Sequence, residues 1–77
     1  MNFNIPTLEK WAVFNDVLIG RTLNHPDFEN GKRIRTNKCI KLDKKIGMAL
    51  CVGNESWQLG EPGHLGMYVD PITKRFF

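Results

Sequence analysis

The chain has 77 residues, of which 42% are apolar and 25% are charged, and its formal net charge is +3. This composition is typical of one small globular domain and excludes a disordered tail. No apolar run approaches the roughly 20 residues that a membrane-spanning helix needs, so we expect no membrane partner.

The chain begins with MNFNIPTLEKW, which lacks the basic and apolar regions of a signal peptide, so we expect a cytoplasmic protein. The segment WAVFNDVLIG then predicts a β-hairpin that turns at Asn15 and Asp16, because both residue types tolerate positive φ. The expected cross-strand pairs are Phe14 with Val17, Val13 with Leu18, Ala12 with Ile19 and Trp11 with Gly20. Both faces of this hairpin are apolar, so its outer face needs a cover, either NIPTLEKW or the C-terminal tail.

Next in the chain, NHPDFENG predicts a structured loop, because Pro26 disfavours helix before it and Asn30-Gly31 is a strong turn signal. The longest strand candidate, KRIRTNKCIKLD, follows. Its alternation predicts a core side with Ile34, Thr36, Ile40 and Leu42, where Lys38 is the exception. The solvent side carries Arg33, Arg35, Asn37, Cys39 and Lys41.

The turn DKKIG leads into MALCV, which pairs with the preceding strand in one of two registers. One register places Cys39 opposite Cys51 and Leu42 opposite Met48, and the other places Cys39 opposite Ala49. Directly opposed strand positions are poor disulfide geometry, so we expect reduced thiols. The cysteines have neither CxxC spacing nor a nearby histidine, which argues against a zinc site.

After a turn at 53–55, SWQL is a short strand candidate, and EPGHLGMYVDPITKRFF is irregular, with a helical turn or an edge strand at GMYV. The short strands in meander order predict a mainly β fold, a small five-stranded antiparallel barrel or rolled sheet of SH3-like size with one short helical turn. An open sheet packed by one short helix is the alternative. We expect a single domain over residues 1–77, with residues 61–77 as an irregular segment packed on it.

Positive charge is concentrated in one segment. Seven of the eleven Lys and Arg residues lie between Lys32 and Lys45, where Asp43 is the only acid, so the segment carries +6 and the rest of the chain −3. We therefore predict that Arg33, Arg35, Lys38 and Lys41 bind an anionic partner. The alternative is that these cations protect an exposed strand and keep the protein soluble.

His25 and Trp57 complete the set of candidate binding residues. His25 either structures its loop by bonding the neighbouring backbone or contacts a ligand. Trp57 belongs to the core if it shares the side of Leu59, and it is an anchor for a base or a protein if it points outward. The acids are scattered in turns, and no phosphate-binding or nucleophile motif is present, so we expect no catalysis and no cofactor.

Positions between residues 11 and 62 form the pattern W, L-x-G, H-P-x-F-x-x-G-x-x-I-x-T and aromatic-x-L-G-E-P. They are Trp11, Leu18, Gly20, His25, Pro26, Phe28, Gly31, Ile34, Thr36, Trp57, Leu59, Gly60, Glu61 and Pro62. In this pattern the chain resembles a group of small bacterial and phage proteins. The resemblance implies a common small β fold and brings no activity with it. Asn37 stands where members often carry Ser, and Trp57 where they often carry Tyr.

These observations predict a non-enzymatic binding protein, in the setting of a phage or mobile-element accessory protein that inhibits or modulates a host macromolecule such as a defence-system component. An acidic host protein is the expected partner. The alternative is a nucleic-acid-binding or nucleotide-sequestering small β-barrel, with a base stacked on Trp57 or Tyr68. The apolar hairpin and the final Phe76 and Phe77 leave a homo-oligomer open.

Overall fold

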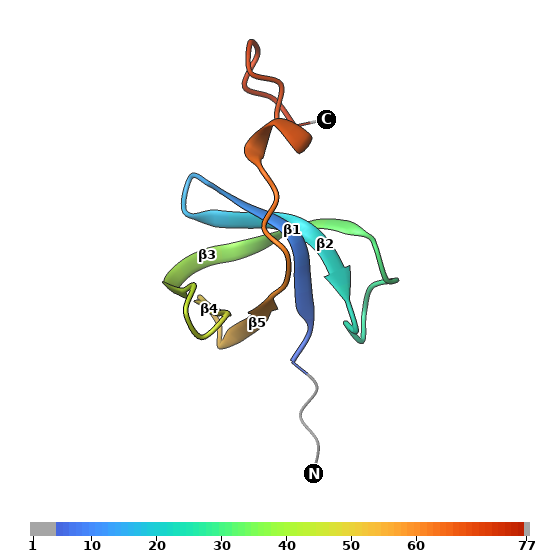
Figure 1. The fold of residues 1–77 in the computed structure, drawn as a ribbon, viewed down its shortest axis with the longest axis vertical. Helices are drawn as coiled ribbons and strands as arrows, with labels where there is room; N and C mark the ends of the chain where they lie inside the picture. Colours follow the sequence, from blue (N-terminus) through green and yellow to red (C-terminus); the bar gives the residue numbers. More distant parts are fainter. Residues whose placement is uncertain (1–4, 77) are drawn as a thin grey trace.

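A computed structural model describes residues 5–76, so Phe77 and the first part of the N-terminal segment lie outside the described residues. The chain forms a closed five-stranded barrel followed by a C-terminal segment (Figure 1). The elements are β1 (Thr7–Phe14), β2 (Val17–Leu23), β3 (Arg33–Asp43), β4 (Met48–Cys51), β5 (Glu55–Leu59) and the 3₁₀ helix η1 (Leu65–Met67). The predicted mainly β, five-stranded fold with one short helical turn is confirmed.

The strands follow one another around the barrel, and each consecutive pair is antiparallel. The barrel closes differently, because β1 and β5 run parallel and pair Thr7 with Gln58 and Leu8 with Leu59. Closure leaves no long free strand edge. Among residues 5–76 the three-residue η1 is the only helix, and no helix is long enough to span a membrane.

The β1–β2 hairpin turns where the sequence predicts. Asn15 and Asp16 have φ values of 48° and 66°, the left-handed conformation that a two-residue turn of this kind needs. Three of the expected cross-strand pairs, from Phe14–Val17 to Ala12–Ile19, are confirmed. The fourth pair is wrong, because the register shifts between Glu9 and Ala12, where Lys10 also has positive φ.

The interior of the barrel holds the larger apolar core. Its buried members are Leu8, Leu18, Ala49, Cys51 and Trp57. The Leu8 side chain packs directly against Gly20 of β2, since a Cβ on Gly20 would lie 2.7 Å from Leu8 Cγ. A glycine at this position therefore leaves room for the Leu8 side chain between β1 and β2.

The outer face of the first hairpin is covered by the C-terminal segment, one of the two expected covers. Tyr68 and Val69 pack on Ala12 and Ile19 in a second buried cluster. Burial raises the pKa of the Tyr68 hydroxyl, so it stays protonated and donates a hydrogen bond to the Lys10 carbonyl oxygen at 2.5 Å. Both faces of the hairpin are apolar because each packs against a different core.

Two shifts of register interrupt β3, and they change which of its side chains face the core. The shift against β2, between Arg35 and Lys38, turns Cys39 toward the core, and the shift against β4, between Cys39 and Lys41, leaves Ile40 64% exposed. The inward placement predicted for Ile40 and the outward placement predicted for Cys39 are therefore wrong. Strict alternation fails here because one residue is inserted relative to the partner strand.

The same shift resolves the pairing of β3 with β4. Cys39 lies opposite Cys51, as one of the two expected registers has it, but Leu42 pairs with Ala49 rather than with Met48. The second shift lies against β2, between Val17 and Ile19. There the Leu18 N–H donates to the Thr36 hydroxyl at 3.0 Å, so the buried backbone group keeps a partner.

The shift at Ile40 can be tested by comparing two isoleucines of β3. Ile40→Thr is expected to change the free energy of unfolding by no more than about 0.5 kcal/mol, as exposed substitutions do. Ile34→Thr is expected to lower it by about 1–2 kcal/mol, because Ile34 packs against the core and the new hydroxyl would be buried there. Denaturant unfolding measures both, and equal losses would contradict the shift.

Candidate binding surface

The four predicted cations of β3 are all exposed. The strand register places Arg21 opposite Arg33, Ile19 opposite Arg35, Val17 opposite Lys38 and Leu50 opposite Lys41. None of these cross-strand partners is a carboxylate, and one is a second arginine. The facing strands therefore supply no opposite charge to Arg35, Lys38 or Lys41.

Arg33 and Arg35 lie beside the C-terminal segment. The Arg35 guanidinium lies 4.8 Å from the centre of the Phe76 ring, a cation–π contact. A small cavity of about 200 Å³ opens here, lined by Ile19, Arg33, Ile34, Arg35 and Phe76. Arg21 continues the cationic area and donates from Nη1 to the Gly31 carbonyl oxygen at 2.9 Å.

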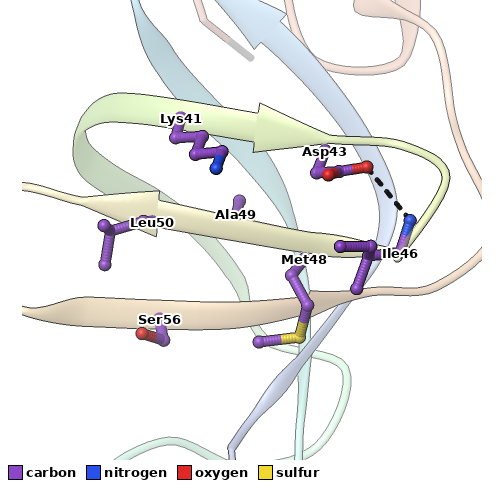
Figure 2. A pocket seen from close by; sticks show the side chains of 7 residues that line it. All are labelled: Lys41, Asp43, Ile46, Met48, Ala49, Leu50 and Ser56. Carbon is purple, nitrogen blue, oxygen red and sulfur yellow. Dashed lines mark hydrogen bonds between the residues drawn. The ribbon is translucent and has the colours of Figure 1, made fainter.

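Lys41 lies on a different part of the surface, at the wall of an apolar groove on the outer side of β3, β4 and β5 (Figure 2). The groove has a volume of about 200 Å³ and is lined by Lys41, Asp43, Ile46, Met48, Ala49, Leu50 and Ser56. Ile46 is 73% exposed and Leu50 is 40% exposed. The C-terminal segment packs on the β1–β2 hairpin. The part of the barrel that carries the groove presents its apolar side chains directly to solvent.

Asp43 is the only acid that lines the groove, and its carboxylate serves the β3–β4 turn. Oδ1 accepts hydrogen bonds from the backbone N–H of Lys45 at 3.0 Å and from that of Ile46 at 3.1 Å (Figure 2). Turns of this kind use aspartate for this backbone contact. Lys44 and Lys45 in the same turn are exposed, and Lys44 lies 5.9 Å from the Trp11 ring.

His25 and Trp57 form a stack at one side of the barrel. The His25 ring lies 5.4 Å from the Trp57 ring at an interplanar angle of 28°, and 4.6 Å from the Phe28 ring. Trp57 is 1% exposed, so the inward orientation expected from the side of Leu59 is confirmed. His25 Nδ1 accepts a hydrogen bond from the Asp27 N–H at 3.0 Å, which confirms its loop-structuring role.

The candidate residues therefore lie in separate places. Arg33 and Arg35 border the C-terminal segment, Lys41 borders the groove, and His25 covers Trp57. Sequence reasoning missed the groove. Its signal was present in MALC, where Met48 and Leu50 take the outward positions that a half-exposed strand normally gives to polar residues.

The described residues contain no group of three His, Cys, Asp or Glu side chains placed to hold a metal ion. Cys39 and Cys51 are both free thiols, and Cys51 is fully buried. Burial raises the pKa of the Cys51 thiol, which keeps it protonated at neutral pH and lowers its reactivity.

No protein-family model matches the chain, and no curated protein or solved structure matches it either. The surface must therefore be interpreted from its own geometry and charge.

The cover that His25 places on Trp57 can be tested by fluorescence. In a Trp11→Phe background, Trp57 is the one remaining tryptophan. His25→Ala is expected to increase acrylamide quenching of Trp57 and to lower the free energy of unfolding by about 1 kcal/mol, the contribution of a stacked aromatic pair. His64→Ala replaces an exposed histidine of the C-terminal segment, so it is the control and should change neither quantity.

The two thiols are expected to differ in reactivity. Alkylation by iodoacetamide at mildly alkaline pH should modify Cys39 well before Cys51, because only the thiolate reacts and the raised pKa of Cys51 moves its ionisation to higher pH. Peptide mass mapping over time measures the two rates. Equal rates in the folded protein would show that Cys51 is not buried.

Proposed function

We propose that the protein is a non-enzymatic binding protein that engages an acidic partner protein through the outward cationic side of β3. The observation that carries this proposal is the register of β3. Arg35, Lys38 and Lys41 are exposed and stand opposite Ile19, Val17 and Leu50, so the facing strands do not balance their charge. A surface of this kind attracts a negatively charged partner and speeds the first encounter with it.

The burial of Trp57 and Tyr68 favours a protein over a nucleic acid. Of the three side chains considered for base stacking, Trp57 and Tyr68 are each 1% exposed, and only Phe76, at 36%, presents part of its ring to solvent. Proteins that bind single strands combine a cationic groove with exposed aromatic platforms. An apolar groove beside Lys41 instead offers contacts that a partner protein uses and a phosphodiester backbone does not.

The biological setting is part of the same proposal. We propose that the protein acts in the cytoplasm as a phage or mobile-element accessory protein, and that it inhibits or modulates an acidic host protein by occupying its surface. The small size of the chain and the resemblance in its H-P-x-F-x-x-G-x-x-I-x-T pattern support this setting. Such a mechanism needs neither a cofactor nor chemistry on the partner.

Charge reversal on β3 tests the proposal. The tagged protein is used to capture partners from host lysate, and Arg33→Glu and Arg35→Glu are each expected to weaken capture about tenfold, which corresponds to about 1.4 kcal/mol. Lys74→Glu changes the net charge equally but lies in the C-terminal segment, so it serves as the control. Circular dichroism confirms that each variant is folded.

Two outcomes would contradict the proposal. Capture that survives both reversals would mean that β3 is not the contact surface. Binding of a labelled single-stranded or duplex oligonucleotide at low salt, lost in the same two variants and at higher salt, would instead favour the nucleic-acid alternative.

A further inference from the structure

We propose that the groove on the outer side of β3, β4 and β5 seats one apolar side chain of the partner, and that Lys41 pairs with an acidic residue next to that side chain. This inference rests on the proposed function and names the chemistry that the surface recognises. The occupant is a segment of a partner protein with a single apolar residue flanked by acids.

The first support is the pattern of β4. Ala49 and Cys51 point into the barrel and are buried, whereas Met48 and Leu50 take the outward positions. With Ile46 they make a continuous apolar lining rather than scattered exposed residues (Figure 2). Exposed apolar residues scattered singly need no partner, whereas contiguous ones that line a groove favour an interaction site.

The second support is the size of the groove and the bonding of its strands. A volume of about 200 Å³ is below the range of roughly 300–1,000 Å³ that small-molecule and cofactor sites occupy. It matches a single inserted side chain. The strand at its centre, β4, is hydrogen-bonded to β3 on one side and to β5 on the other, so no peptide can add to it as a further strand. The contact must therefore be made by side chains.

The third support is charge complementarity. Lys41 lines the groove, and Lys45 lies next in the chain to Ile46 and is exposed. The carboxylate of Asp43 accepts hydrogen bonds from two backbone N–H groups of the turn, so it is held by the turn rather than turned toward an occupant of the groove. An apolar side chain in the groove would thus have cationic neighbours, which favours acidic residues on either side of it.

A set of synthetic peptides tests this inference by NMR on the isotope-labelled protein. The first peptide has a central leucine between glutamates, the second replaces the leucine with serine, and the third keeps the leucine but replaces the glutamates with glutamines. The first peptide is expected to bind in about the millimolar range and to shift the amides of residues 46–50 most. Each of the other two should bind about tenfold more weakly, because burying a leucine and pairing a charge each contribute to affinity.

Matched variants locate the contact. Ile46→Gln is expected to weaken binding of the leucine peptide about tenfold, and its high exposure means that the fold should tolerate the change. Leu50→Gln is the second groove variant. Val13→Gln is the control, because Val13 is 47% exposed, similar to Leu50, but lies on β1 outside the groove.

The outcomes separate this inference from the proposed function. If host-lysate capture is weakened by Arg33→Glu but unchanged by both groove variants, the groove inference fails and the proposed function stands. If capture is unaffected by the charge reversals and by the groove variants, both fail. Peptide shifts around Arg33 and Arg35 that do not depend on the central leucine would also overturn the groove.

Two other occupants would overturn the inference. Binding to vesicles with anionic lipids that Ile46→Gln abolishes, without binding of the leucine peptide, would assign the groove to a membrane surface. Concentration-dependent shifts at residues 46–50 in the free protein, with a dimer in sedimentation, would assign it to a second copy of the chain.

Discussion

Both the core and the outer surface of the barrel depend on the irregular step in β3 between Cys39 and Lys41. N-terminal to this step, alternation places Ile34 and Thr36 toward the interior. An earlier shift against β2 leaves Cys39 facing inward opposite Cys51, and at the step itself Ile40 is the inserted, exposed residue. C-terminal to it, Lys41 points outward and lies opposite Leu50. Without the inserted residue, Lys41 would point into the barrel instead of outward, and the groove would lose its cation.

The barrel has two outer regions with different roles. Over β1 and β2, Tyr68 and Val69 cover Ala12 and Ile19, so these apolar side chains contribute to stability. Over β3, β4 and β5, the apolar side chains of Ile46 and Leu50 stay in contact with water. Exposing such groups brings no gain from burial in the free protein. The proposed contact with a partner would bury them.

Much of the fold could be predicted from local signals in the sequence. Asn15-Asp16 fixed the first hairpin, because only a few residue types adopt the required conformation. The turn at Gly53 and Asn54, both with positive φ, was predicted for the same reason. Strand periodicity placed Trp57 on the inner side. These predictions depend on neighbouring residues alone.

The remaining features could not be predicted because they depend on contacts between distant residues. The parallel pairing of Leu8 with Leu59 joins the two ends of the barrel, and no turn between them encodes it. The shift at Ile40 has no glycine or proline to mark it. Arg33, Arg35 and Lys41 were correctly expected on the exposed side of β3, but their separation into two areas and the exposure of Lys38 follow from the shifts of that strand.

The short strand β4 has a consequence for how this protein can change over time. Its inward residues, Ala49 and Cys51, hold the barrel together, while its outward residues, Met48 and Leu50, line the groove. Alternate positions of β4 are therefore constrained differently, the inward ones by packing in the core and the outward ones by the shape of the groove. Under the proposed function, substitutions at the outward positions would alter which partner is recognised while leaving the fold intact, so the preference for a partner could change on a constant scaffold.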